Sequence, residues 1–270
     1  AKLNAERSIC SVTIPKTKLP TLPKTNPIHT KMILLPTAYL GNIQYYSKLL
    51  SGHACIDLHE HYLKQSWRNR CDILSAGGIM SLTVPVYHTG GINTPTREIR
   101  IDYAKRWQHQ HWQAIVSAYR GAPYFDHYEG AFAPLFTERF EKLVELNNAL
   151  LEITLRLLDP SGKVADQIAF TDHYWSCDKT EVSTNMDHDS NAMPASKDAN
   201  KLEGEQVCDL RTCFSPKPRL SRPDPTFTAP QYYQTFSDRL PFAPNLSIID
   251  LLFCEGPASA DILRSAYHKP

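Results

Sequence analysis

The sequence lacks the long apolar runs and the charge surplus that mark several protein classes. No apolar stretch approaches the ~20 residues of a membrane-spanning helix, and no apolar core of a signal peptide is visible. We therefore expect no membrane span and a cytoplasmic location. The 29 Lys and Arg residues nearly balance the 28 Asp and Glu residues and leave a formal charge of +1. Nucleic-acid binding usually needs a basic surplus on one face, so we expect no nucleic-acid partner, although a few local cations could hold a small anion.

Several motifs that identify a cofactor or a nucleophile are also missing. The chain has no Walker loop, no Rossmann glycine triplet and no GxSxG elbow. His59 and His61 would lie on one face of a continuing strand, but two imidazoles without a third ligand hold zinc poorly. The sequence thus predicts neither a cofactor nor a metal site. The seven cysteines are odd in number and widely spread, which is typical of reduced thiols rather than of a disulfide framework.

Two stretches have a composition that does not predict a packed core. Residues 1–31 carry repeated Pro, Thr and Lys without a sustained apolar period, which indicates an extended or mobile leader. Residues 178–206 mix Asp, Asn, Ser, Lys and Glu. Such a segment cannot bury enough apolar surface to offset its ordering entropy, so we expect a disordered insert. Apart from this insert, residues 32–270 are expected to form one main domain.

The remaining patterns predict an α/β fold. An apolar run at 32–35, a helical pattern at 43–50 and a second apolar run at 53–58 predict a βαβ unit with two parallel strands. Alternating residues on both sides of Ser75–Gly78 predict a β-hairpin. We therefore expect a partly parallel sheet with a hairpin and flanking helices. Ligands gather at the carboxyl ends of the strands in such sheets, which would place residues 36–39 and 59–70 on one rim.

The second half of the ordered chain alternates strand and helix patterns. Residues 98–103 alternate apolar and charged side chains and predict another half-buried strand. Residues 106–119 and 134–158 hold the period of amphipathic helices, and Pro134 suits a first helical turn. Further along, Ser247 and Asp250 have the spacing of a capping box at the start of a core helix, and a last helix is expected at 258–267.

The stretch from His59 to Cys71 is polar although it lies between apolar strands. Lys64, Arg68 and Arg70 place three cations close together among amide and aromatic side chains. Arginine binds carboxylates and phosphates through paired hydrogen bonds and lysine adds a point charge, so the cluster favours recognition of a small anionic ligand. The alternative is a solvated strand whose cations pair with nearby carboxylates at little energetic gain. The residues expected to contact the ligand are Tyr39, Lys64, Gln65, Trp67, Arg68, Asn69 and Arg70.

His111 is the best candidate for acid–base catalysis, because an unperturbed histidine pKa of ~6.5 suits proton transfer near neutrality. It lies inside the apolar arc of the helix predicted at 106–119. The alternative is a packed histidine that hydrogen-bonds to a carboxylate or carbonyl and orients the rim.

A set of short blocks matches a known family in the order of that family. The blocks are Leu35–Leu40, Tyr62–Cys71, Leu82–Val86, Trp107 with His111–Trp112 and Ser117–Tyr119, Ala122–Phe125, Asp209–Arg211 with Ser215–Lys217, and Pro244–Pro257. Together they resemble the WbqC-like protein family. No single block is diagnostic, but the ordered set is specific.

The resemblance implies a role in surface-polysaccharide biosynthesis of the O-antigen type, because some members lie in O-antigen gene clusters. It also implies a transferase, since glycine transfer in polysaccharide decoration has been suggested for a relative. We hypothesise a cytoplasmic transferase that moves an amino acid or acyl group to a sugar, with a nucleotide-sugar or activated acyl donor as its small anionic ligand. The alternative is a non-catalytic binding or assembly protein that uses the same basic rim. The two differ in whether His111 and the cations open into one pocket.

Overall fold

The computed structural model describes residues 32–87, 94–175, 207–217 and 221–268. The leader expected at 1–31 and the insert expected at 178–206 lie outside the described residues. The strands of the described part are β1 (Met32–Pro36), β2 (Ala54–Asp57), β3 (Arg70–Ser75), β4 (Gly78–Thr83), β5 (Ala169–Phe170) and β6 (Val207–Asp209). The helices are α1 (Ile43–Leu49), α2 (Trp107–Tyr119), α3 (Phe125–Phe132), α4 (Leu143–Leu158), α5 (Lys163–Gln167), α6 (Ile248–Glu255) and α7 (Ser259–Ala266), with 3-10 turns η1 (Thr96–Glu98), η2 (Ala133–Phe136) and η4 (Gly256–Ala258).

Four strands form a parallel sheet in the order β5-β2-β1-β6. The register pairs Ile33 of β1 with Ala54 of β2 and ends at Pro36 and Asp57. Strands that are covered on both faces read as continuous apolar runs, as β1 does, and Leu34 and Leu35 are fully buried. The prediction of an α/β fold with a partly parallel sheet is confirmed.

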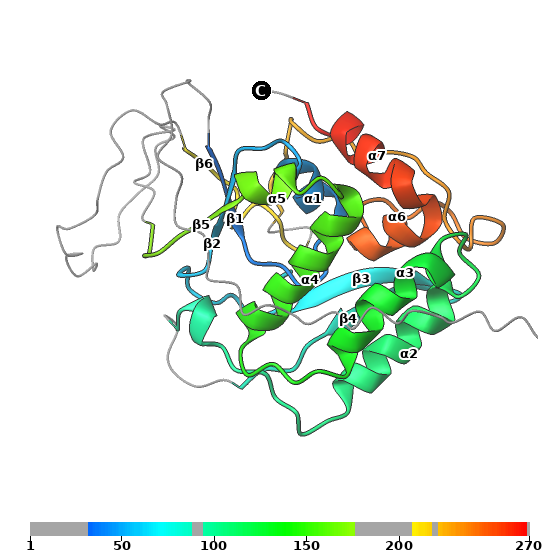
Figure 1. Cartoon of the computed structure of the whole chain (residues 1–270), viewed down its shortest axis with the longest axis horizontal. Helices are drawn as coiled ribbons and strands as arrows, with labels where there is room; N and C mark the ends of the chain where they lie inside the picture. Colours follow the sequence, from blue (N-terminus) through cyan, green and yellow to red (C-terminus); the bar gives the residue numbers. More distant parts are fainter. Residues whose placement is uncertain (1–31, 88–93, 176–206, 218–220, 269–270) are drawn as a thin grey trace, which may run out of the picture.

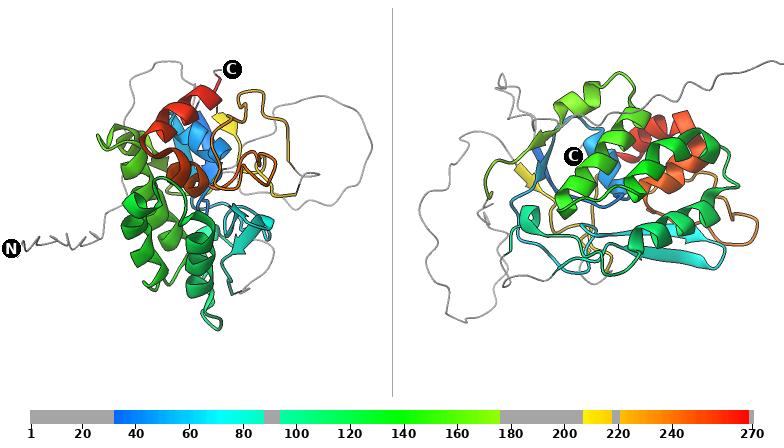
Figure 2. Two further views of the ribbon diagram at one scale, coloured as in Figure 1. Left: turned by 90° about the vertical axis from the view of Figure 1, so that its right-hand side faces the viewer. Right: turned by 60° about the horizontal axis from the view of Figure 1, so that its bottom comes forward.

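The antiparallel pair β3–β4 forms the hairpin that the sequence predicts. Its register runs from Arg70 opposite Thr83 to Ser75 opposite Gly78, and Gly78 turns the chain with a φ of 105° that favours glycine. Helix α2 packs on β3. In Figure 1 the parallel sheet lies at the left, and the hairpin runs from below it toward α2 and α3. The right-hand view in Figure 2 also shows the parallel sheet and the hairpin as separate parts of the structure.

One large apolar cluster joins these parts. It includes side chains from the sheet, the hairpin and all of the longer helices. Leu146 of α4 and Leu251 of α6 are fully buried in it. None of the helices in the described ranges is long and apolar enough to cross a membrane.

The strand expected at 98–103 was a wrong prediction. Residues 96–98 form the 3-10 turn η1, and the residues after it make only isolated bridges, Arg100 with Lys142 and Ile101 with Val86. The alternation of burial is real, because Ile99 and Ile101 are both buried. The backbone bonds nevertheless go to several different segments, so no ladder forms.

The single helix expected at 134–158 is also wrong, because α4 begins only at Leu143. The Glu145 carboxylate accepts hydrogen bonds from the backbone N–H groups of Glu141 and Lys142, each at 3.1 Å, and so caps the helix there. The residues around Pro134 form the separate turn η2.

The capping box expected at Ser247 does not form. Ser247 precedes α6, but its hydroxyl donates to the carbonyl of Leu40 at 2.7 Å. Asp250 instead accepts hydrogen bonds from the hydroxyls of Tyr119 and Tyr232. Both side chains thus join α6 to distant segments rather than satisfy its first turn.

Candidate functional site

The carboxyl ends of the parallel strands carry two buried arginines that are each held by carboxylates. β2 ends at Asp57 and β6 at Asp209, and the segments that follow them supply Arg68 and Arg211. This is the edge at which parallel sheets gather their ligands. Both arginines belong to the candidate site.

Arg68 is only 2% exposed and forms a paired contact with the Glu60 carboxylate. Its Nε lies 2.7 Å from Glu60 Oε1, Nη2 bonds to Oε2, and Nη2 also donates to the Arg211 carbonyl at 3.2 Å. Burial raises the pKa of Glu60 to about 7, and the Arg68 guanidinium opposes that rise. The Arg68–Glu60 pair therefore fixes the course of the chain after β2.

Arg211 lies between two carboxylates, one at the end of β2 and one at the end of β6. Its Nη1 donates to Asp57 Oδ2 at 2.6 Å, and its Nη2 and Nε donate to Asp209 at 2.7 Å and 3.0 Å. Burial opposes the charge of this guanidinium, but the two carboxylates outweigh burial and raise the pKa of Arg211. Asp57 also accepts a hydrogen bond from the Thr171 hydroxyl at 2.7 Å. These contacts join the ends of β2, β5 and β6.

Both arginines line a cavity of about 310 Å³, called the rim pocket below. One wall follows β2 and the other follows β6. The residues that line it are Leu63, Lys64, Gln65, Ser66 and Arg68 on the first wall and Arg211, Thr212, Phe214, Ser215, Lys217 and Arg222 on the second. Its volume falls at the lower end of the ~300–1,000 Å³ range of small-molecule sites.

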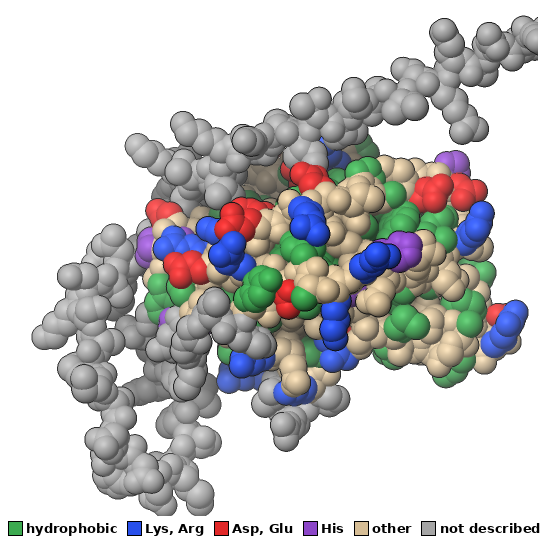
Figure 3. All heavy atoms as spheres, turned by 90° about the horizontal axis from the view of Figure 1, so that it is seen from below, with side chains coloured by type: hydrophobic (Ala, Val, Ile, Leu, Met, Phe, Trp, Pro, Cys, Tyr) green, Lys and Arg blue, Asp and Glu red, His purple; other side chains and the backbone are tan. Residues whose placement is uncertain are grey.

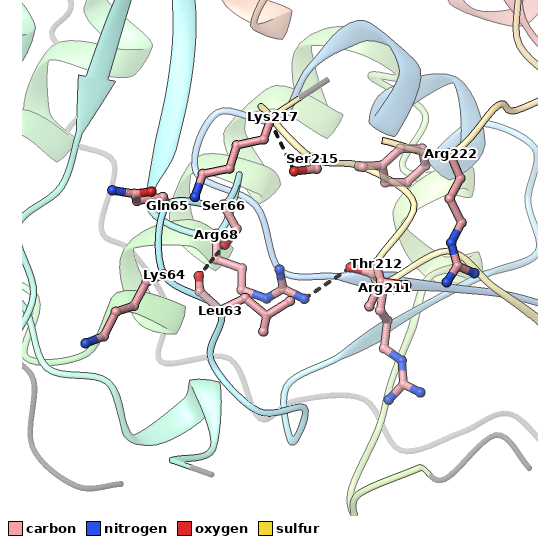
Figure 4. Close-up of a pocket in the computed structure, with 11 residues that line it drawn as sticks. Leu63, Lys64, Gln65, Ser66, Arg68, Arg211, Thr212, Ser215, Lys217 and Arg222 are labelled. Carbon is pink, nitrogen blue, oxygen red and sulfur yellow. Dashed lines mark hydrogen bonds between the residues drawn. The ribbon is translucent and has the colours of Figure 1, made fainter. Parts of the chain in front are cut away.

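Three cations of the rim pocket have no carboxylate partner within the described residues. These are Lys64 on the first wall and Lys217 and Arg222 on the second. Figure 4 shows the Lys217 side chain extending toward Gln65 and the opposite wall, with Lys64 and Arg222 at the two sides. Unpaired cations in a cavity attract an anion. Elsewhere, on the face seen in Figure 3, Lys and Arg are interspersed with Asp and Glu instead of forming one basic surface.

The structure brings only part of the predicted ligand set to the rim pocket. Lys64, Gln65 and Arg68 line it, and the other four residues do not. Those four are Tyr39, which is fully buried, Trp67, which packs against the core, Asn69, which donates to the Val84 carbonyl, and Arg70, which bonds to Asp72 and Ser81 on the hairpin. The backbone N–H of Tyr39 donates to the Trp67 carbonyl at 2.9 Å, so the two segments expected on one rim do adjoin.

His111 is not among the residues that line the rim pocket. It is 6% exposed, its Nδ1 lies 2.9 Å from the Tyr39 hydroxyl, and its ring also bonds to the backbone of Thr83. Burial lowers the pKa of His111 to about 4, and the Thr83 contact opposes that change only in part. The ring is thus neutral at pH 7 and engaged at two contacts. Its acid–base role stays a prediction.

Sequence reasoning missed the second wall. Arg211, Ser215 and Lys217 belong to blocks that carried the family resemblance, so a signal was present. They were not assigned to the rim because β6 has only three residues and pairs with β1 from far along the chain. A strand that short gives no reliable pattern.

The described residues contain no group of three or more His, Cys, Asp or Glu side chains that could hold a metal ion. The lining of the rim pocket suits an anion instead, because its charged members are all cations.

Comparison with known proteins agrees with the ordered blocks of the sequence. The sequence model described as the WbqC-like protein family matches residues 38–262. Uncharacterized protein Rv1507c of Mycobacterium tuberculosis (strain ATCC 25618 / H37Rv) is 30% identical over 206 residues, which cover 75% of this chain and 84% of that protein. No solved structure gives a significant match. The family match spans most of the chain, including both walls of the rim pocket, and the chain therefore belongs to the WbqC-like protein family.

Proposed function

We propose that the protein acts in polysaccharide-related biosynthesis in the cytoplasm, where it holds the anionic group of an activated donor in the rim pocket. The donor is a nucleotide-sugar or an activated acyl compound. One observation carries the proposal: Lys64, Lys217 and Arg222 line one cavity, and within the described residues none of them pairs with a carboxylate. Membership of the WbqC-like family supports the biosynthetic context.

In the catalytic version, the protein transfers an amino acid or acyl group from the donor to a sugar. Such a transfer needs a group that accepts the proton of the attacking nucleophile. His111 is the residue proposed for this step. It would have to act from outside the described lining of the pocket, because its ring contacts Tyr39 and Thr83.

The non-catalytic version is a binding or assembly protein that uses the same basic rim. One observation favours it: among the described residues that line the rim pocket there is no Asp, Glu, His or Cys. A protonated lysine or arginine holds an anion but does not accept a proton. In this version the protein releases the bound donor chemically unchanged.

A thermal-shift screen of nucleotide-sugars and of acyl and aminoacyl donors tests the binding step. A ligand at 100 times its Kd stabilises the native state by about 2.7 kcal/mol, which is readily measured. The shift should shrink in Lys217→Ala and persist in Lys163→Ala, an exposed lysine of α5 that serves as the matched control. The proposal fails if no donor shifts the transition or if both variants respond alike.

The same donors then separate the two versions. Each donor that stabilises the protein is incubated with it and with candidate sugar acceptors, and the donor is quantified by chromatography. Consumption of the donor, abolished in His111→Gln at unchanged donor affinity, supports the transferase. Full recovery of the donor with every acceptor supports the binding protein.

A further inference from the structure

The two buried arginines of the rim pocket are already neutralised by the protein itself. Arg68 is paired with Glu60, and Arg211 is paired with Asp57 and Asp209. These carboxylates are part of the fold and do not leave when a ligand arrives. The charge available to a ligand therefore comes from the outer cations, Lys64, Lys217 and Arg222.

The outer cations are spread over both walls instead of converging on one point. Lys64 follows β2, whereas Lys217 and Arg222 follow β6. Figure 4 shows Lys217 between the other two, with its ammonium directed toward the first wall. A single carboxylate or phosphate can be surrounded by only part of such a row. An anion with two linked charged centres can present one centre to each wall.

The local charge fits the same kind of ligand. The five cations that line the pocket and the three carboxylates that hold its arginines leave a net charge of +2 when all are ionised. A diphosphate that joins two other groups and a single terminal phosphate each carry about two negative charges at neutral pH, whereas a carboxylate carries one. The charge therefore favours a phosphate over a carboxylate, and the spread of the cations over both walls favours two phosphates over one. Leu63 and Phe214 add an apolar residue on each wall, and Leu63 is 45% exposed. The exposed Leu63 suits the body of a larger conjugate beside its charged bridge, whereas Phe214 is buried and belongs to the core.

We propose that the rim pocket recognises a diphosphate bridge, centred on Lys217, with one phosphate toward Lys64 and the other toward Arg222. This inference rests on the proposed use of the pocket for an anionic donor and names the chemical class of that donor. The bridge has two common sources, a nucleotide-sugar and a coenzyme A thioester. Hydroxyls of Thr212 and Ser215 on the second wall provide further donors for the phosphate oxygens.

The test is calorimetric titration of the full chain with inorganic pyrophosphate, inorganic phosphate and acetate at one ionic strength. Pyrophosphate should bind at least tenfold more tightly than phosphate, and acetate more weakly than both. Lys64→Ala and Arg222→Ala should each weaken pyrophosphate binding about fivefold to tenfold. At least one of the two should leave phosphate binding unchanged, because one phosphate cannot contact both cations. Lys163→Ala should leave every affinity unchanged.

Two further ligands identify the source of the bridge. A UDP-sugar and coenzyme A are titrated in parallel with acetyl phosphate, which lacks the bridge. Tighter binding of one of the first two assigns the donor class. The inference is overturned if pyrophosphate binds no more tightly than phosphate, or if only one of the outer cations affects it. In that event the proposed function still stands if a donor shifts the thermal transition and the shift shrinks in Lys217→Ala. The proposed function itself fails if no donor shifts the transition, or if Lys217→Ala and Lys163→Ala respond alike.

Discussion

Replacement of Arg68 by Met should destabilise the protein strongly, because it leaves the Glu60 carboxylate buried without its partner. Arg68 and Glu60 are only 2% and 4% exposed, so water cannot replace the guanidinium. Removal of one partner of a buried ion pair costs about 3–5 kcal/mol. The hydrogen bond from Arg68 to the Arg211 carbonyl is lost as well, at about 1 kcal/mol. We expect the free energy of unfolding at pH 8 to fall by about 4 kcal/mol.

The loss of stability in Arg68→Met should depend on pH, and the protonation of Glu60 sets the direction of that dependence. Its native pKa, raised by burial to about 7, lies above the ordinary value of 4.5, and removal of Arg68 raises it further. A group with a raised native pKa contributes most stability below its unfolded pKa, and that contribution disappears as the pH rises through the native pKa. Glu60 is protonated and neutral in the variant at pH 5.5, so the destabilisation should be at least about 1 kcal/mol smaller there than at pH 8.

Urea unfolding followed by tryptophan fluorescence measures both quantities. Arg70→Met is the matched control, because Arg70 is partly exposed in its pair with Asp72 and should cost less than about 1 kcal/mol. The double variant Glu60→Leu with Arg68→Met removes both charges and should be more stable than Arg68→Met alone. A loss below about 1 kcal/mol at pH 8, or equal losses at both pH values, would refute the reasoning.

Two further predictions concern a histidine and a glycine. The native pKa of His111, lowered by burial to about 4, lies below its ordinary 6.5, so the stability of the neutral ring is present above pH 6.5 and is lost as the pH falls, by up to about 3 kcal/mol. Urea unfolding between pH 7.5 and pH 4 should show a shallower decline for His111→Gln, and parallel curves would contradict the assignment. Gly256 has a φ of 54°, and an added Cβ would collide with the Tyr124 ring, so Gly256→Ala should cost about 1–3 kcal/mol. Gly130→Ala in α3, where a Cβ meets open space, should be neutral or stabilising, and equal melting temperatures for the two variants would contradict this account.

The parts of the fold that local pattern encodes could be predicted from the sequence. β1 is apolar throughout because both of its faces are covered, and the glycine at position 78 turns the hairpin. The errors fall where a tertiary contact decides an element's limits. Glu145 starts α4 from inside the helix, and residues 98–103 alternate in burial without pairing as a strand. Periodicity reports which side chains are buried, not where their backbones find partners.

The candidate site could be predicted only as a cluster of charges. Its position at the carboxyl edge follows from the parallel sheet, and Lys64 and Arg68 do line the pocket. Pairing of these cations with nearby carboxylates was the alternative, and Arg68 does pair with Glu60, but the pair is buried and not solvated as that alternative expected. The wall that contains Lys217 depends on the pairing of β6 with β1, and these two strands are far apart in the sequence. Such long-range pairing leaves no mark in a local window.

Loss of ligand binding has a different meaning in variants of the buried arginines than in variants of the outer cations. Arg68 lines the pocket, but its substitution removes the support of the first wall and destabilises the fold. Arg211 on the second wall likewise lines the pocket and also holds two carboxylates of the fold. A variant of either arginine that fails to bind a donor therefore cannot distinguish a lost contact from a lost structure. Lys64 and Lys217 have no partner carboxylate within the described residues, so their removal should leave the free energy of unfolding nearly unchanged. Loss of binding identifies a ligand contact only in variants of that kind.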